Sequence, residues 1–299
     1  NLLWGELTHA RKEAPTHIAV IFDAGSKTFR NDIFPAYKAN RPPLPEDLRP
    51  QFPLTRDATR AFNVACIEMA GYEADDIIAT LAKRASEAGG TVTILSSDKD
   101  LMQLIGSGVD MHDPMKNKRL GLDEVMEKFG VAPDRVVDVQ SLAGDSVDNV
   151  PGAPGIGLKT AALLIQEYGD LDTLLARAGE IKQPKRREAL LDNAEQIRIS
   201  RRLVQLDGDM PLDVALDSLE LKDPEPEAVM GFLNEMEFRT LTKRVAERLK
   251  IDAPEMDTAR GMHVEGAHDA APVVPQKPFD HAGYACIRDM AALTAWIDR

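Results

Sequence analysis

The chain has 299 residues, 43% of them hydrophobic, and 49 acidic residues against 36 basic ones give a formal net charge of -13. This length suggests about two domains with a sizeable core. No apolar stretch approaches the roughly 18 residues of a membrane helix, and the first residues lack a secretory-signal pattern. The two cysteines have no CxxC spacing, which argues against a disulfide framework and a zinc site. We expect a soluble cytoplasmic protein, whose acidic excess disfavours a nucleic-acid partner only if it is spread evenly over the surface.

Residues 1–140 alternate strand-like and helix-like patterns. After an amphipathic opening over 1–12, we predict a strand over 18–22, helices over 57–69 and 75–88, and a strand over 91–95. A further helix begins near Pro133 and ends at Gly144. The order of these elements predicts a parallel sheet between helices, which is an α/β fold.

The rest of the chain has a different organisation. Residues 141–250 hold helical patterns broken by glycine and proline, which predicts an all-helical second domain with one helix over 158–168. Residues 251–278 collect Pro, Gly, Ala, His and Asp without periodicity, as is typical of a flexible linker. Residues 279–299 begin a new strand and helix but are too few to fold alone, so we expect the natural protein to continue past residue 299.

Acidic residues stand at four places where a predicted element ends or begins. They are Asp23, the group Glu73, Asp75 and Asp76, the pair Asp98 and Asp100, and the pair Asp145 and Asp148. Ligands bind at the carboxyl ends of parallel strands, so we expect the groups after 18–22 and 91–95 to face one rim. Carboxylates gathered in one pocket need cations between them, and Mg²⁺ or Mn²⁺ prefers oxygen ligands. The alternative is that each cluster only caps a helix and complements its dipole.

A glycine-rich segment, PGAPGIGLKT, spans residues 151–160. It is neither a Walker loop nor a GxGxxG motif, because Leu158 separates Lys159 from the last glycine and Thr160 stands where a glycine is needed. A tight turn that feeds a helix remains, and the free N–H groups of that helix can hold a phosphate beside Lys159. Such a turn can grip duplex DNA without reading sequence. The alternative is an ordinary turn between two helices.

Basic and aromatic residues are mixed between residues 27 and 49. The basic ones are Lys27, Arg30, Lys38, Arg41 and Arg49, and the aromatic ones include Phe29, Phe34 and Tyr37. This mixture suits single-stranded nucleic acid, because cations follow phosphates and rings stack on bases. A solvated loop with scattered charges is the alternative. A second basic run, over 182–202, extends a duplex-binding track or forms a solvated helix face.

Several strings of this chain, in this order, resemble the 5′ nuclease domain of bacterial DNA polymerase I. They are VIFDA (20–24), YKANRP (37–42), GYEADD (71–76), SDKDL (97–101), GDSVDN (144–149) and the segment 151–160. The resemblance covers residues 1–249, and the residues after 283 are similar to the start of the proofreading-type 3′-5′ exonuclease domain. It implies a nuclease of the flap-endonuclease type, with an α/β core over 1–140 and a helix-three-turn-helix domain over 141–250.

The resemblance also implies roles for individual residues. All eight carboxylates named above match acidic residues around two divalent metals, Mg²⁺ or Mn²⁺. Lys38 and Arg41 match the basic positions of a helical arch that guides a 5′ single strand, and both are expected to be catalytic. Lys27 and Arg30, from the basic and aromatic segment described above, are expected to bind DNA. The turn that holds the duplex, and that often binds K⁺ through its carbonyls, matches Gly152, Gly155, Gly157, Lys159 and Thr160. The implied reaction is phosphodiester hydrolysis at a 5′ DNA flap or nick in replication and repair, by a monomer.

One departure from the family concerns the start of the chain. Family members begin with a strand that ends in another metal-binding Asp, followed by a helix with a basic residue, and this chain begins after both. We therefore expect the first strand to be missing, and the chain to cleave flaps poorly while its full-length parent is active and is also a polymerase. Two alternatives are an endoribonuclease with a similar sheet and a smaller acidic cluster, and a binding protein whose metals serve structure only.

Overall fold

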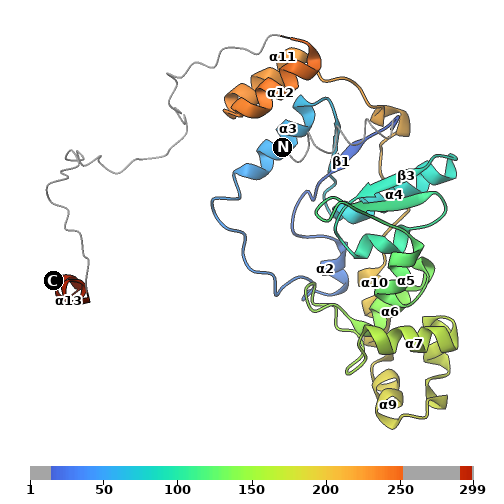
Figure 1. Ribbon diagram of the computed structural model, residues 1–299. Helices are drawn as coiled ribbons and strands as arrows, with labels where there is room; N and C mark the ends of the chain where they lie inside the picture. The colour runs from blue at the N-terminus through green and yellow to red at the C-terminus, as the bar shows by residue number, and fades with distance from the viewer. Residues whose placement is uncertain (1–14, 252–289, 298–299) are drawn as a thin grey trace. The chain divides into compact units, whose positions relative to one another are not determined.

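The computed structural model describes residues 15–251 and 290–297 (Figure 1). Residues 15–251 lie in one compact unit, and residues 290–297 lie in another. The second unit contributes only helix α13 (Met290–Ile297). The amphipathic opening expected over 1–12, the linker and the strand expected after residue 283 lie outside the described residues.

The strands form two small sheets in the described part of the chain. Strand β1 (Ala19–Ile21) pairs in parallel with β2 (Ala65–Ile67), with Val20 opposite Cys66. Strand β3 (Val92–Leu95) pairs in parallel with β4 (Val109–Asp113), and β5 (Lys118–Leu120) joins β4 antiparallel. The predicted α/β class is confirmed, and the strands predicted over 18–22 and 91–95 exist. They belong to different sheets rather than to one.

Helix α4 (Ala74–Glu87) connects the two sheets. Its residues Ile77 and Leu81 are buried in a cluster with Ile67 of β2, whereas Ala82 packs in a second cluster with Ile94 of β3. Two stripes of one amphipathic helix thus pack against different strands. The first turn of α4 consequently lies where chain segments from both sheets end.

The helix predicted over 57–69 is wrong in its second half. Helix α3 (Gln51–Ala61) ends early, and β2 follows within four residues. The break lies at Asn63, whose φ of +55° is left-handed and whose side chain donates to the carbonyl of Asp223 at 2.8 Å. A left-handed residue cannot continue a right-handed helix.

The remaining helices follow β5 in the sequence, apart from α2 (Phe29–Ile33). They are α5 (Leu122–Phe129), α6 (Val136–Ala143), α7 (Leu158–Tyr168), α8 (Leu171–Ala176), α9 (Pro184–Asp192), α10 (Ala194–Val204), α11 (Pro226–Glu235) and α12 (Arg239–Leu249). Short 3-10 turns occupy Asp100–Leu104, Pro133–Arg135, Ala178–Glu180 and Leu216–Leu219. The predicted helix over 158–168 is confirmed, and so is the helix end at Gly144.

The largest core runs without a break across the expected boundary at residue 140. It joins Ile94 of β3 and Met111 of β4 to Val139 of α6, Ile165 of α7 and Leu174 of α8. The division at residue 140 stays a prediction. A separate core joins the end of α3 to α11 and α12, which lie beside α3 in Figure 1. No helix within the described residues has both the length and the apolar character needed to cross a membrane.

Candidate active site

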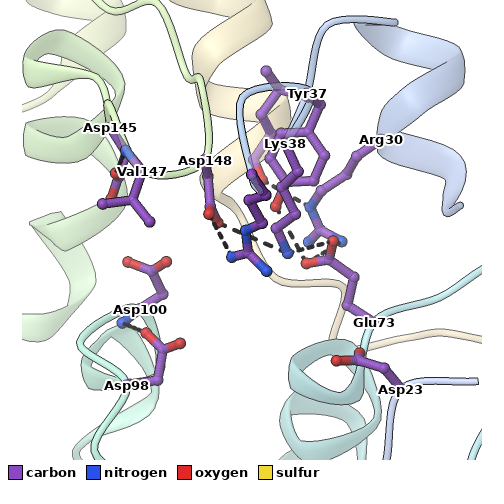
Figure 2. A network of polar contacts seen from close by, with 12 residues as sticks. Asp23, Arg30, Tyr37, Lys38, Glu73, Asp98, Asp100, Asp145, Val147 and Asp148 are labelled. Carbon is purple, nitrogen blue, oxygen red and sulfur yellow. Dashed lines mark hydrogen bonds and ion pairs between the residues drawn. The ribbon is translucent and has the colours of Figure 1, made fainter. Parts of the chain in front are cut away.

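Seven of the eight predicted carboxylates lie along one acidic site, at the start of α4, after β1 and β3, and after α6. We define the acidic site by Asp23, Glu73, Asp75, Asp98, Asp100, Asp145 and Asp148. Figure 2 shows Asp98 and Asp100 next to Asp145 and Asp148, with Glu73 and Asp23 across from them. Acidic groups that are far apart in the sequence thus lie in one part of the molecule, and two strands from different sheets and two helices position them.

A tight loop after α6 fixes the position of Asp145. The backbone of Asp145 exchanges two hydrogen bonds with Val150, at 2.9 and 2.7 Å, and its Oδ1 accepts the N–H of Val147 at 2.8 Å. Gly144 and Gly152 touch at the base of the loop, where a Cβ on Gly152 would lie 2.4 Å from the nitrogen of Gly144. Both glycines have a positive φ, so only glycine fits this contact without strain.

Two carboxylates in the acidic site have raised pKa values, because burial and neighbouring carboxylates outweigh the nearby lysines. Burial, followed by repulsion from Asp98 and Glu73, raises the pKa of Asp75 to about 7. Burial and then repulsion from Asp98 raise the pKa of Asp100 to about 6, although Gln140 donates to its Oδ1 at 2.5 Å. A desolvated group of like charges favours protonation or the arrival of a cation.

The donor atoms fit a hard divalent cation, because they are all carboxylate oxygens. Nevertheless, within residues 15–251 and 290–297 no three acidic, histidine or cysteine side chains are close enough together to hold one metal ion. Asp75, Asp98 and Asp100 would have to approach one another for that.

Three basic side chains that are partly exposed form ion pairs with carboxylates of the acidic site, and the buried Arg30 lies behind them, with its Nη1 3.7 Å from Glu73 Oε2. Lys38 Nζ lies 2.7 Å from Glu73 Oε1 and 3.8 Å from Asp148 Oδ2. Arg41 donates to Asp148 Oδ1 at 2.5 Å. The family resemblance matched both residues to an arch that guides a single strand, and in the structure both contact carboxylates of the acidic site.

Lys99 is the third basic residue, and the sequence motifs did not identify it as a site residue. Its Nζ forms an ion pair with Asp145. Burial opposes the change, but this ion pair and the hydrogen bond from Val147 hold the pKa of Asp145 below its usual range. The signal was present in the string SDKDL, because a lysine between two site aspartates must lie close to them.

Arg30 and Asp76 do not belong to the acidic site, which corrects two predictions. The two side chains form a bidentate ion pair at 2.7 and 2.8 Å, and their side-chain exposures are 1% and 0%. Asp76 also accepts the N–H groups of Glu73 and Asp207, while Arg30 donates to the carbonyls of Leu203 and Gln205. Neither charge is accessible to a metal or a phosphate, so both residues stabilise the fold.

Asp23 has a structural contact in addition to its place at the site. Its Oδ1 accepts the N–H of Ala74 at 2.8 Å, so it caps the start of α4. The alternative interpretation of the acidic clusters as helix caps thus holds in part for this residue. Lys27, four residues later, is exposed.

The glycine-rich segment divides into a buried and an exposed part. Gly152 is buried, its N–H donates to Ser200 Oγ and its carbonyl accepts from Gln196 Nε2, so its predicted contact with DNA does not fit this structure. Gly155, Gly157 and Lys159 are exposed, and Thr160 is half-buried. Gly157 precedes α7 without a side-chain cap, which leaves the first N–H groups of the helix for an external acceptor.

Two protein-family models match consecutive parts of this chain. A family model described as the 5′-3′ exonuclease N-terminal resolvase-like domain matches residues 6–130, and one described as the 5′-3′ exonuclease C-terminal SAM fold matches residues 131–227. Both the acidic site and the glycine-rich segment fall within the matched residues.

Individual relatives agree with the family models. The chain is 48% identical to DNA polymerase I of Rhizobium leguminosarum, over 99% of this chain and 34% of that protein. It is 36% identical to a 5′-3′ exonuclease of Aquifex aeolicus, over 79% of this chain and 80% of that protein. The chain thus spans about a third of the length of the polymerase relative.

A solved structure shows the same fold. The bacteriophage T5 flap endonuclease, in a complex with DNA and metal ions, aligns with a TM-score of 0.59 at 20% sequence identity, covering 82% of this chain and 87% of that chain. The α/β nuclease fold with a helical carboxyl-terminal domain is therefore confirmed.

Proposed function

Because the chain belongs to the 5′-3′ exonuclease family, we propose that it hydrolyses phosphodiester bonds in DNA that carries a 5′ flap or a nick. The observation that carries this proposal is the acidic site itself, where carboxylates from four chain segments crowd beside Lys38 and Arg41. Carboxylates alone would repel a DNA phosphate. The site becomes suitable for phosphate chemistry when cations lie between the two.

We further propose that Asp75, Asp98 and Asp100 hold divalent cations, Mg²⁺ or Mn²⁺, together with Asp145 and Asp148. Bound cations would supply positive charge beside the reacting phosphate and lower the pKa of the attacking water. The raised pKa values of Asp75 and Asp100 support this assignment, because they show negative charge that the protein does not neutralise. Glu73 and Asp23, across the site, complete the acidic surroundings.

Lys38 and Arg41 are proposed to stabilise negative charge on the phosphate. The Lys38 side chain is 23% exposed and that of Arg41 is 51% exposed, so both can reach a ligand at the site surface. A half-buried lysine loses less solvation on meeting a phosphate than an exposed one, and its charge acts at short range in a poorly solvated site. The exposed Lys27 is proposed to contact the DNA backbone.

The start of α7 is proposed to hold the duplex part of the DNA. Its uncapped N–H groups and the exposed Lys159 can bind a backbone phosphate, and Thr160 is within the first turn. Gly155 and Gly157 keep this surface free of side chains. Binding of K⁺ by carbonyls of the same turn stays a proposal.

We propose that the chain forms the 5′ nuclease part of a protein of the DNA polymerase I type, acting in replication and repair. The relative from Rhizobium leguminosarum supports this proposal, because the similarity covers 99% of the chain. Polymerase activity is proposed for such a whole protein and not for the residues of this chain.

Single-turnover cleavage of a 5′-flap DNA, with protein in excess so that slow hydrolysis is also measured, tests the proposed function. We expect cleavage that requires Mg²⁺, that EDTA stops and that Asp98→Asn reduces at least 100-fold. The matched control is Asp217→Asn, an exposed aspartate of the turn Leu216–Leu219, which should cleave like the unmodified chain. Mg²⁺-independent cleavage, or full activity of Asp98→Asn, would contradict the proposal.

DNA binding in Ca²⁺ separates nuclease function from a binding-only role. Lys159→Ala should weaken binding of the flap DNA several-fold, whereas Lys222→Ala, at another exposed lysine, should not. A binding-only protein would show the same loss of affinity but no cleavage in Mg²⁺.

A further inference from the structure

Four hydrogen bonds clamp residues 36–41 to the loop that carries Asp148. The backbone N–H of Lys38 donates to the carbonyl of Asp148 at 2.9 Å, and Asn149 Nδ2 donates to the carbonyl of Ala36 at 2.6 Å. Asn40 Nδ2 donates to the carbonyl of Ser146 at 2.6 Å, and Arg41 donates to Asp148 Oδ1 at 2.5 Å. We call these contacts the clamp. They join segments more than 100 residues apart in the sequence.

The clamp lies where the chain passes from the buried Tyr37 to an exposed segment. Residues 39–50 are all exposed, so they provide little packing that could fix Lys38. On the inner side, Tyr37 is buried with Val150, Leu203 and Val204. The order of the Lys38 backbone therefore depends on the Tyr37 side chain and on the clamp.

Asn149 and Lys38 face each other across the clamp, and both have a left-handed backbone, with φ of +58° and +57°. Asparagine tolerates this conformation, but for lysine it costs about 1 kcal/mol or more. Such a conformation persists only where neighbouring contacts determine it. The bond from Asn149 to Ala36 and the bond from Lys38 to Asp148 close a ring around this strained residue.

We propose that Asn149 is a positioning residue that holds the Lys38 ammonium group at the acidic site. The proposal rests on the proposed function, in which Lys38 stabilises the reacting phosphate. Lys38 Nζ lies 2.7 Å from Glu73, and its backbone is placed by the clamp. Without the amide of Asn149, the strained backbone of Lys38 relaxes and the ammonium group moves away from the site.

The test compares two asparagines with the same backbone and the same kind of bond. Asn149→Gly removes the amide and keeps a residue that tolerates a positive φ. Asn63→Gly is the matched control, because Asn63 also has a left-handed φ, +55°, and its side chain also donates to a backbone carbonyl, at 2.8 Å. Asn63 lies between α3 and β2, away from the clamp.

We expect Asn149→Gly to slow single-turnover cleavage of saturating 5′-flap DNA about 10-fold, because small displacements of a charged group have effects of this size. The dissociation constant for DNA should stay the same. Hydrogen exchange at the Lys38 amide should accelerate at least 10-fold, since that N–H loses its ordered acceptor. Asn63→Gly should leave both the cleavage rate and this exchange rate unchanged.

A double variant distinguishes positioning from a general loss of structure. Lys38→Ala combined with Asn149→Gly should cleave no more slowly than Lys38→Ala alone, because a misplaced lysine and an absent one are equivalent. Cleavage by Asn149→Gly at the unmodified rate would overturn the proposal. So would a double variant whose rate falls by the product of the two single effects.

Two further measurements keep the outcome clear. If Asn149→Gly melts far below Asn63→Gly, Asn40→Ala replaces it. Asn40 is exposed, so we expect this variant to fold. It should cleave several-fold more slowly, and an unchanged rate would show that the clamp does not position Lys38 and would overturn the proposal. Failure of the proposed function would give a different pattern of results from failure of the positioning proposal. In that case Asp98→Asn and Lys38→Ala do not alter cleavage, whereas the exchange of the Lys38 amide still reports whether Asn149 holds the clamp.

Discussion

Asp75 and Asp76 are adjacent in sequence, yet we expect opposite effects when each is replaced by asparagine. Asp76 is fully buried, forms a bidentate ion pair with Arg30 and accepts two backbone N–H groups. Asp75 is half-buried and repelled by Asp98 and Glu73. One carboxylate is thus fully satisfied in the metal-free protein, and the other is not.

The size of each effect follows from these contacts. Removing one partner of a buried ion pair leaves an uncompensated charge and costs about 3–5 kcal/mol, which we expect for Asp76→Asn. For Asp75, a pKa raised from 3.8 to about 7 corresponds to at most about 4 kcal/mol of destabilisation near pH 8. Solvent screening of a half-buried group reduces this to roughly 1–2 kcal/mol. Asp75→Asn should therefore stabilise the metal-free protein.

Urea unfolding at pH 8, in EDTA and again in Mg²⁺, measures both effects. In EDTA the free energy of unfolding should fall for Asp76→Asn and rise for Asp75→Asn. In saturating Mg²⁺ the unmodified chain should gain about 2–3 kcal/mol at a hundredfold excess over the dissociation constant. Asp76→Asn should keep this gain, whereas Asp75→Asn should lose most of it.

Two results would refute this reasoning. Unchanged stability of Asp76→Asn would mean that the buried pair with Arg30 is not formed, and destabilisation by Asp75→Asn in EDTA would mean that Asp75 is not repelled.

Three further outcomes can be measured with the same unfolding assay. In EDTA, the free energy of unfolding should fall as the pH rises from about 4 to 7, because Asp75 and Asp100 have raised pKa values in the folded state and still bind protons that the unfolded chain has released. In Mg²⁺ this dependence on pH should disappear. The same dependence in both conditions would contradict the metal assignment. Gly152→Ala should lower the free energy of unfolding by at least about 2 kcal/mol, because its Cβ would lie 2.4 Å from a backbone atom. Gly155→Ala has open space around its Cβ, so it should lose only about 1 kcal/mol, the cost of its positive φ. Equal losses would show that the close contact is absent. Lys99→Met should lower the free energy of unfolding in EDTA by roughly 1 kcal/mol. The stabilisation by Mg²⁺ should increase, because a cation then replaces the lost positive charge. A more stable variant in EDTA would rule out the ion pair with Asp145.

Local patterns in the sequence predicted the helices and strands whose ends are marked by residues such as glycine. Helix α7 was predicted over its observed length because Gly157 and Gly169 flank it. The helix predicted over 57–69 failed because its amphipathic pattern continues past Asn63, and only a tertiary partner, β1, makes Ala65–Ile67 a strand. The hydrophobic periodicity of residues 57–69 gives no information about pairing with β1.

The acidic site was predictable as a set but not residue by residue. Sequence placed Asp75 and Asp76 together in the first turn of a helix, and successive residues of a helix point about 100° apart. Which of them faces the site depends on where Arg30 is buried, and Arg30 is held by carbonyls of residues 203 and 205. Such a contact across more than 170 residues leaves no trace in local spacing.

The touching backbones of Gly144 and Gly152 have a consequence for where DNA would be cut. On one side of this contact lies the loop with Asp145, and on the other side lies the turn that leads into α7. A further bond, from the N–H of Ala153 to the carbonyl of Leu142 at 2.7 Å, ties the two sides together. The part proposed to bind the double helix and the part proposed to cleave the strand are thus joined directly through backbone contacts. Under the proposed function, the distance between these two parts would set the number of nucleotides between the duplex junction and the cleaved bond, and the contact between Gly144 and Gly152 would maintain that distance.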